Sequence, residues 1–298
     1  MPRAVRLALL WLGVVGALAL VCEAQVRSAQ PNLRHPLLRD LVGWWRGSPG
    51  FTGGNQIYDL VNRNHGAFNA MGYGDGVSGW SVSTRTTGLM QINCDGIDDQ
   101  VTIAPHATLT DLQALTVVLW VNVVSYDGEG DLGRLVDKRD LGGWNLLVDN
   151  FDSSNGLAFN QSFSDADGQW GVDNVLSLNT WLRVGVTYDS SSTATVPTFY
   201  VNGVAYAPTA FYSDPSGTRL SDVNSTLRFC GNGAGTRWFH GALENVRLWR
   251  RVLTDTEMAE DYRLALLADA DLVQERNFVN VPPAAGTGRR GSFLPFFR

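Results

Sequence analysis

Few side chains in this sequence could do chemistry, and their spacing does not match the common catalytic motifs. The sequence has no Gly-x-Ser-x-Gly nucleophile turn, no His-Glu-x-x-His zinc motif and no Gly-rich phosphate loop. Its histidines stand far apart along the chain, and such residues more often satisfy loop hydrogen bonds than bind a metal. The four histidines are His35, His65, His106 and His240.

Acidic residues gather in one tight turn between two strand-like segments. The alternating segment 88–94 runs into Asp95-Gly96-Ile97-Asp98-Asp99, and the segment 100–103 leaves it. An Asp-Gly pair between β-rich segments is a strong turn signal, because glycine adopts a positive φ without steric cost. The pattern predicts a strand, a turn and a second strand.

The first 24 residues are typical of a secretory signal peptide. Arg3 and Arg6 precede an apolar run of 15 residues, 7–21, and Cys22-Glu23-Ala24 follows as a small-residue cleavage site. The run is short for a membrane span, which needs about 20 residues. We therefore predict cleavage after residue 24 and a secreted, soluble mature protein that is not held in a membrane. An uncleaved anchor is the alternative.

Charge and cysteine content fit export. The formal net charge is −6, and removal of two arginines and one glutamate with the signal makes it −7. A negative surface argues against nucleic acid or an anionic membrane as the main partner. Cys94 and Cys230 would remain, each in a predicted strand, so a disulfide is geometrically feasible in an oxidising compartment. Two unpaired buried thiols are the alternative.

The elements that position these residues are predicted to be strands. Residues 115–124 are rich in β-branched side chains, residues 181–188 alternate, and Asn202-Gly203 marks a hairpin. Similar short segments recur between turn clusters, which favours an all-β sandwich of two antiparallel sheets. One C-terminal helix is predicted, with Thr254 and Glu257 as a capping box. Its expected apolar stripe comprises Met258, Tyr262, Ala265 and Leu266.

These elements give a simple domain organisation. After the signal, 1–24, comes a linker, 25–36, and then one sandwich domain, 37–268. Residues 269–298 contain a Pro-Pro-Ala-Ala-Gly-Thr-Gly stretch and a basic-aromatic end without periodicity. We expect this tail to be disordered and to lie outside the fold.

In order along the chain, the segments resemble the laminin-G-like (LamG-like) jelly-roll family of the concanavalin A-like lectin and glucanase superfamily. The resemblance covers nearly the whole domain and implies a jelly-roll sandwich that is used more often for binding than for catalysis. The segments that carry it are Leu41-Val-Gly-Trp-Trp45, Tyr58-Asp-Leu-Val-Asn-Arg-Asn-His-Gly66, Asp95-Gly-Ile-Asp-Asp-Gln-Val101, Leu115-Thr-Val-Val-Leu-Trp-Val121, Leu178-Asn-Thr-Trp-Leu-Arg-Val-Gly-Val-Thr-Tyr188, Tyr200-Val-Asn-Gly-Val204 and Phe239-His-Gly-Ala-Leu-Glu-Asn-Val-Arg-Leu-Trp249.

The resemblance also implies a structural Ca²⁺, which the superfamily can hold near the opening segment, the Asp-Gly turn and the last strand. Calcium takes six to eight oxygen ligands. This chain departs from the family pattern at Leu60-Val61, at Arg63 and at the last-strand acid, where glutamate replaces aspartate. Capping of their own turns is the alternative role for such residues. The candidate ligands are Asp59, Asn62, Asn64, Asp98 and Glu244.

Hydrolysis of glycosides is the minor functional alternative. A retaining hydrolase needs two carboxylates about 5–5.5 Å apart, which glucanases of the superfamily supply as Glu-x-Asp-x-x-Glu. The nearest match here is Glu129-Gly-Asp131-Leu-Gly-Arg134, in which arginine replaces the final acid. We therefore predict that the protein is not an enzyme.

Aromatic side chains near loops are the candidate ligand contacts, because they can stack on a sugar while short polar residues orient its hydroxyls. The favoured function is a secreted binding or adhesion module that recognises a carbohydrate or an extracellular protein. The alternative is a structural component of a surface layer, matrix or particle, with the sandwich as scaffold. The candidate aromatic residues are Tyr126, Trp144, Trp170, Tyr212 and Trp238.

Overall fold

The computed structural model describes residues 28–47, 54–71, 78–126, 132–150 and 154–276. The chain divides into two units, residues 1–29 with 275–298, and residues 30–274. The fold described below is that of residues 30–274. The predicted signal, the Glu129 and Asp131 pair and the end of the predicted tail lie outside the described residues. No helix within the described ranges combines the length and the apolar character needed to cross a bilayer.

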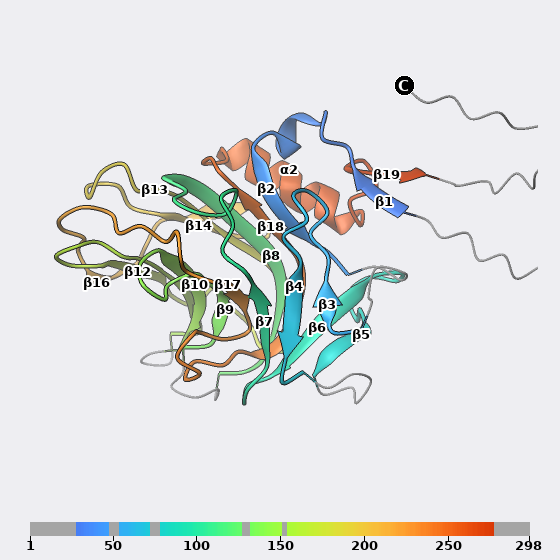
Figure 1. Ribbon diagram of the computed structural model, residues 1–298, viewed down its shortest axis with the longest axis horizontal. Helices are drawn as coiled ribbons and strands as arrows, with labels where there is room; N and C mark the ends of the chain where they lie inside the picture. Colours follow the sequence, from blue (N-terminus) through green and yellow to red (C-terminus); the bar gives the residue numbers. More distant parts are fainter. Residues whose placement is uncertain (1–27, 48–53, 72–77, 127–131, 151–153, 277–298) are drawn as a thin grey trace, which may run out of the picture. The chain divides into compact units, whose positions relative to one another are not determined.

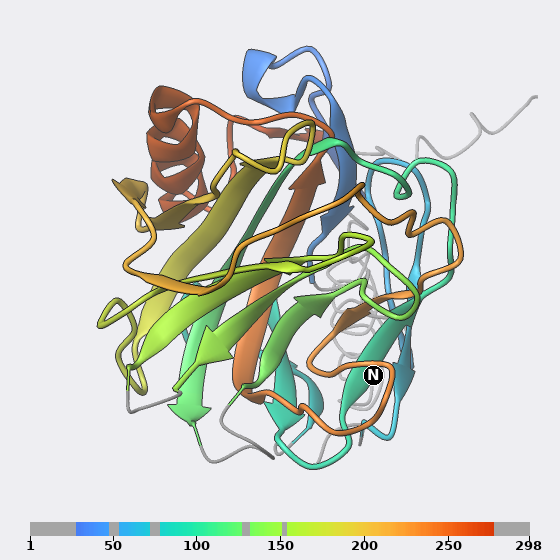
Figure 2. The ribbon, with the colours of Figure 1, turned by 90° about the vertical axis from the view of Figure 1, so that its left-hand side faces the viewer.

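Residues 30–274 form a sandwich of two antiparallel sheets, as predicted (Figure 1). The nine-stranded sheet has the order β16-β12-β11-β10-β9-β17-β7-β4-β3, and the eight-stranded sheet has the order β15-β14-β13-β8-β18-β6-β5, with β2 also paired to β18. In Figure 2 the green strands of the first sheet lie in front of the orange strand β18 of the second. The nine strands are β3 Gln56–Ile57, β4 Gly66–Asn69, β7 Gln100–Ile103, β9 Arg134–Asp137, β10 Trp144–Asp149, β11 Gly156–Gln161, β12 Gly168–Val172, β16 Ala210–Ser213 and β17 Leu227–Phe229.

The second sheet is built from longer strands. The 3-10 helix η1 spans Pro36–Leu38 and the helix α2 spans Asp255–Leu266, while β1 and β19 pair as a two-stranded sheet. The strands of the second sheet and of the small sheet are β2 Leu41–Trp45, β5 Gly79–Val82, β6 Met90–Asp95, β8 Ala114–Ser125, β13 Trp181–Asp189, β14 Thr198–Val201, β15 Val204–Tyr206, β18 His240–Trp249, β1 Ser28–Pro31 and β19 Val273–Arg276.

Alternation along the central strands builds two cores. In β8, Leu115, Val117 and Leu119 face the nine-stranded sheet and belong to the main core. Val118, on the opposite face, belongs to a second cluster that includes residues of α2 and η1. Both faces of this strand are therefore buried, which explains its nearly continuous apolar sequence.

Local signals placed the hairpin and the helix start correctly. Asn202 and Gly203 have φ values of 52° and 77° and connect β14 to β15, so the hairpin is confirmed. The Thr254 side chain accepts a hydrogen bond from the Glu257 backbone, and the Glu257 side chain accepts one from the Thr254 backbone, which confirms the capping box. Both features depend on residues close in sequence.

The predicted apolar stripe of the helix was partly wrong. Met258 and Ala265 are buried as predicted, but Leu266 is exposed and Asp261 is fully buried. Asp261 can lie on the buried face because arginines of the sheet meet its carboxylate there. The hydrophobic pattern could not reveal a charged residue with a buried partner.

The C-terminal edge of the domain lies later than residue 268. Asp269 and Leu272 have no exposed surface, and Leu272 packs in the second core. The backbone N–H of Asn32 donates to the carbonyl of Leu272 at 2.7 Å. The first part of the predicted tail, and part of the predicted linker, thus belong to the unit 30–274.

Candidate functional site

A groove of about 270 Å³ opens on the outer face of the nine-stranded sheet. Leu146 and Val148 of β10 point into the core, so their neighbours Leu147 and Asp149 face the groove. Cross-strand pairing places small residues beside Leu147, because Leu147 pairs with Ala158 and Ala158 pairs with Gly171. Small side chains in one row leave the floor of the groove low. Its lining consists of Leu132, Arg134, Arg139, Leu147, Asp149, Ala158, Asn160, Gln169 and Tyr212.

A row of polar side chains crosses the sheet beside this floor. Asn145 pairs in register with Asp137 on one side and with Asn160 on the other, and Asn160 pairs with Gln169. The Asn160 amide donates to Asn145 Oδ1 at 2.9 Å, and the Asn145 amide donates to Asp137 Oδ2 at 3.0 Å. This chain of hydrogen bonds fixes the amide groups in one orientation. Gln169, at the end of the row, is half-buried.

Tyr212 forms the aromatic wall of the groove. Its ring lies over Gly171, where an added Cβ would come within 2.9 Å of the ring. Its hydroxyl donates to Asp149 Oδ2 at 2.6 Å, a charge-assisted hydrogen bond that fixes the ring. Tyr212 is 44% exposed, so the ring still offers a face to a ligand.

Two guanidinium groups border the groove. Arg134 pairs with Asp137 at 3.5 Å, and Arg139 pairs with Asp167. Burial lowers the pKa of Arg134 to about 10, so the group is still protonated at neutral pH. Burial also raises the pKa of Asp137. Arg134, the residue that replaces the final acid of the glucanase pattern, thus supplies a cation to this groove.

Of the five aromatic residues predicted as ligand contacts, Tyr212 is the one that lines the groove. Trp144 and Trp170 are each 1% exposed and belong to the main core, so their prediction as exposed platforms was wrong. They lie on the inner face of β10 and β12 because strand side chains alternate. Tyr126 is partly buried against the same core, and Trp238 packs against Gly231. Neither Tyr126 nor Trp238 lines the groove.

The predicted calcium ligand Asp59 has another role. One carboxylate oxygen accepts hydrogen bonds from the backbone N–H groups of Trp44 at 2.9 Å and Val61 at 3.0 Å. The other accepts from the backbone N–H groups of Asn62 and Asn64, both at 3.0 Å. Four donors occupy this carboxylate, so it acts as the cap of its own loop. The Asn62 amide donates to the carbonyl of Val42, and the Asn64 amide donates to Thr108.

Glu244 is also committed to partners other than a metal. Arg85 donates to Glu244 Oε2 from Nε at 3.0 Å and from Nη2 at 2.8 Å, and the Ser83 hydroxyl donates to Oε1. Asp59, Asp98 and Glu244 do not form one group of neighbouring carboxylates among the residues that the structure describes. The five predicted ligands therefore do not meet as one site, and calcium itself stays a prediction.

A different acidic cluster lies in the turn between β6 and β7. Ligand oxygens of Asp95, Asp98 and Asp99 all lie within 4.8 Å of one another, so the cluster could hold an ion. Asp95 Oδ1 accepts from the backbone N–H of Ile97 at 2.8 Å, and Asp99 Oδ2 accepts from that of Asp95 at 2.7 Å. Burial, together with the neighbouring carboxylates, raises the pKa of Asp99 to about 7.

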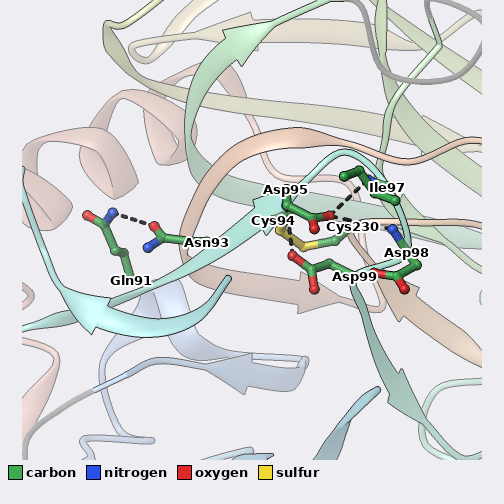
Figure 3. The surroundings of a disulfide bond; sticks show 8 residues. All are labelled: Gln91, Asn93, Cys94, Asp95, Ile97, Asp98, Asp99 and Cys230. Carbon is green, nitrogen blue, oxygen red and sulfur yellow. Dashed lines mark hydrogen bonds between the residues drawn. A yellow bond between two sulfur atoms is a disulfide. The ribbon is translucent and has the colours of Figure 1, made fainter. Parts of the chain in front are cut away.

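The cluster lies beside a disulfide that joins the two sheets (Figure 3). Cys94 of β6 and Cys230, directly after β17, are bonded, with Cα atoms 6.0 Å apart. Of the two alternatives for these cysteines, the structure has the disulfide. Because β6 and β17 belong to different sheets, the bond ties the sandwich together at this turn.

Sequence reasoning missed a buried ion network under α2. Asp261 accepts from Arg183 Nε at 2.9 Å and also pairs with Arg247, while Arg247 pairs with Asp269. All four side chains are at most 2% exposed. The Arg247 guanidinium also lies 4.4 Å from the ring centre of Trp44, a cation–π contact. This network fastens the helix to the outer face of the eight-stranded sheet.

The fold and the sites together define a concanavalin A-like sandwich with a polar groove on one sheet. A family profile described as Laminin_G_3, of the concanavalin A-like lectin/glucanases superfamily, matches residues 95–259. The chain therefore belongs to this family, as its sequence pattern indicated. A comparison with curated proteins gives no match.

Solved structures with this fold include receptor-binding domains of toxins. The binding domain of Paraclostridial Mosquitocidal Protein 1 has a TM-score of 0.52 and 15% identity, over 76% of this chain and 52% of that one. The binding domain of botulinum neurotoxin DC in complex with rat synaptotagmin II has a TM-score of 0.53 and 12% identity, over 76% and 52%. The same domain in complex with SialylT gives 0.50 and 11%, over 77% and 52%. This chain spans about half the length of those structures.

Proposed function

We propose that this protein is an exported, non-catalytic binding module whose ligand is a carbohydrate, held in the groove on the outer face of the nine-stranded sheet. The observation that carries the proposal is the composition of that groove. Leu147 and Ala158 provide a low apolar floor, and a row of amides runs along its edge. Tyr212 stands at its wall.

This composition suits a sugar ring better than it suits an apolar ligand. A sugar has an apolar C–H face that stacks on aromatic or aliphatic surface, and hydroxyls that need oriented donors and acceptors. Asn160 and Gln169 offer amides, Asp149 offers a carboxylate, and Arg134 offers a guanidinium. The hydrogen bonds within the polar row hold the Asn160 amide in place before a ligand arrives, and the bond from Tyr212 holds Asp149, which lowers the entropy cost of binding.

The structural neighbours are consistent with a binding role without naming the ligand. The botulinum neurotoxin DC binding domain has been solved in complex with SialylT and also with synaptotagmin II, so this fold serves carbohydrate and protein recognition there. An extracellular protein is therefore the alternative ligand for this chain. The Cys94–Cys230 disulfide supports export, because such bonds persist in oxidising compartments.

We further expect no glycoside hydrolysis. A hydrolase needs two carboxylates across the scissile bond, and Asp149 is the one carboxylate among the described residues that line the groove. The purified protein should release no reducing ends from β-glucan, galactan or sialoside above background. The non-catalytic assignment would be contradicted if the wild type hydrolyses one of these substrates and Asp149→Asn, Glu129→Gln or Asp131→Asn abolishes that activity.

A glycan array, followed by calorimetry on the best saccharide, tests the binding proposal. Tyr212→Ala and Gln169→Ala should each weaken binding about three- to tenfold, the loss of one stacking contact or one hydrogen bond. Phe211→Ala is the matched control, because Phe211 is the adjacent residue of β16, is 57% exposed and does not line the groove. If Phe211→Ala weakens binding as much as Tyr212→Ala and Gln169→Ala do, the ligand does not bind in the groove. If no saccharide on the array binds and the purified protein assembles into ordered particles or layers, the alternative function as a structural component is favoured.

A further inference from the structure

We propose that the side chains of Lys138 and Asp222 become joined by an amide bond, a cross-link that the folded protein forms by itself. Lys138 directly follows β9 and is the only lysine in the sequence. Asp222 lies in the loop between β16 and β17. The inference does not depend on what the groove binds.

The first argument is the contact between two buried reactive groups. Lysine is almost never fully buried, yet the side chains of Lys138 and Asp222 are both 0% exposed. The nitrogen Nζ of Lys138 lies 3.2 Å from Oδ2 of Asp222 and donates to the backbone carbonyl of Asp222 at 2.7 Å. The carboxyl carbon Cγ is one bond from Oδ2. Reacting groups that are held in contact need no further encounter, which removes a large part of the barrier.

The second argument is the difference between the two carboxyl oxygens of Asp222. Oδ1 accepts a hydrogen bond from the backbone N–H of Asp111 at 2.6 Å. Oδ2 is buried and has no hydrogen-bond partner among the described residues. Backbone N–H groups stabilise the negative charge that develops on oxygen during acyl transfer. Oδ1 is therefore the oxygen that can hold this charge, and Oδ2, beside the ammonium group, is the oxygen that can leave.

The third argument is the cost of keeping both groups charged in a dry place. Burial lowers the pKa of Lys138, although the charge of Asp222 opposes this. The neutral amine, which is the nucleophilic form of lysine, thereby becomes easier to reach. The chain packs tightly over the pair, since a Cβ added at Gly143 would lie 2.8 Å from Cβ of Asp222. An amide carries no charge, so its formation removes the desolvation cost of both ions.

The reaction is a condensation that needs no oxidant and no cofactor. A proton passes from Nζ of Lys138 to Oδ2 of Asp222, which gives a neutral amine and a carboxylic acid. Nζ then attacks Cγ, and negative charge develops on Oδ1, where the Asp111 N–H donates. The bond between Cγ and Oδ2 breaks, and Oδ2 leaves as water with a second proton from Nζ. The product is an amide that keeps one N–H.

The cross-link would fasten the end of β9 to the loop before β17. The two residues are 84 positions apart in sequence. β9 and β17 already pair through Val136 and Phe229, so the covalent bond would lock a contact that the fold has formed. Reduction breaks the Cys94–Cys230 disulfide but would leave this amide intact.

A protease that cleaves only after lysine tests the proposal on the full chain, because Lys138 is its single target. The reduced, denatured wild type should resist cleavage, since such enzymes need a free ammonium group. Its intact mass after reduction should be lower than the mass calculated from its sequence by one water. Asp222→Ala should be cut once, after residue 138, and should have its full calculated mass. Digestion under denaturing conditions makes this variant informative even if it does not fold.

Arg139→Gln is the matched control. Arg139 follows Lys138 directly but pairs with Asp167, so this variant should keep both the protease resistance and the missing water. Peptide mapping of the reduced wild type should give one linked species that contains Lys138 and Asp222. The proposal is overturned if the reduced, denatured wild type is cut after Lys138 and has its full calculated mass, or if Asp222→Ala still lacks one water.

Discussion

Replacing Asp261 by alanine should lower the free energy of unfolding by about 3–5 kcal/mol and the Tm by roughly 10 °C. The carboxylate pairs with both Arg183 and Arg247, and none of the three side chains is more than 2% exposed. Removing it leaves two buried guanidinium groups short of counter-charge, a larger penalty than the loss of a favourable contact. Burial already lowers the pKa of Arg183 to about 10, which reports the cost of a charge at this position.

Urea unfolding of Asp261→Ala beside Glu260→Ala gives the measurement and its control. Glu260 is the preceding residue of α2 and pairs with Arg263 on an exposed surface, so its loss should cost about 0.5 kcal/mol or less. A destabilisation below about 1 kcal/mol for Asp261→Ala would mean that the buried network does not hold the helix.

Breaking the disulfide should have a comparable effect. Cys94→Ala should lower stability by about 2–5 kcal/mol, because the bond closes a loop with a sequence separation of 136 and so restricts the unfolded chain. Cys94→Ala with Cys230→Ala should be about as destabilised as either single variant, since both singles already lose the bond. Non-reducing peptide mapping must first show the linked peptides in secreted protein.

Two results would contradict a stabilising Cys94–Cys230 disulfide. Two alkylatable thiols in the native secreted protein would show that the bond is not formed. Reduction of the wild type and the double alanine substitution should lower stability by similar amounts. If reduction lowers stability and the double variant stays as stable as the oxidised wild type, the effect of reduction does not come from the Cys94–Cys230 bond.

Features encoded by neighbouring residues were predictable. The Asn202-Gly203 hairpin, the Thr254 capping box and the alternation of residues 181–188 each lie within one short segment, and each was placed correctly. The inward position of Trp170 was also encoded locally, in the alternation of its strand, but the polar residues before it favoured a loop. It lies between Gly168 and Val172 in a strand whose period of two places it inward with Val172.

Features that depend on distant partners were not predictable. The groove combines residues of β9, β10, β11, β12 and β16, whose adjacency follows from strand pairing. The family resemblance made Glu244 a candidate metal ligand, whereas its partner in the structure, Arg85, lies 159 positions away in sequence. Asp261 violated the apolar stripe for the same reason, since Arg183 is 78 positions distant. Single-sequence patterns carry no information about such pairs.

A crystal structure of the protein with the strongest saccharide from the array tests the proposed function most directly. Binding in the groove predicts density for a sugar ring over Leu147 and Ala158, with hydroxyls directed at the Asn160 and Gln169 amides and the sugar beside the Tyr212 ring. Density for the saccharide on any other face, with the groove filled by water alone, would contradict it.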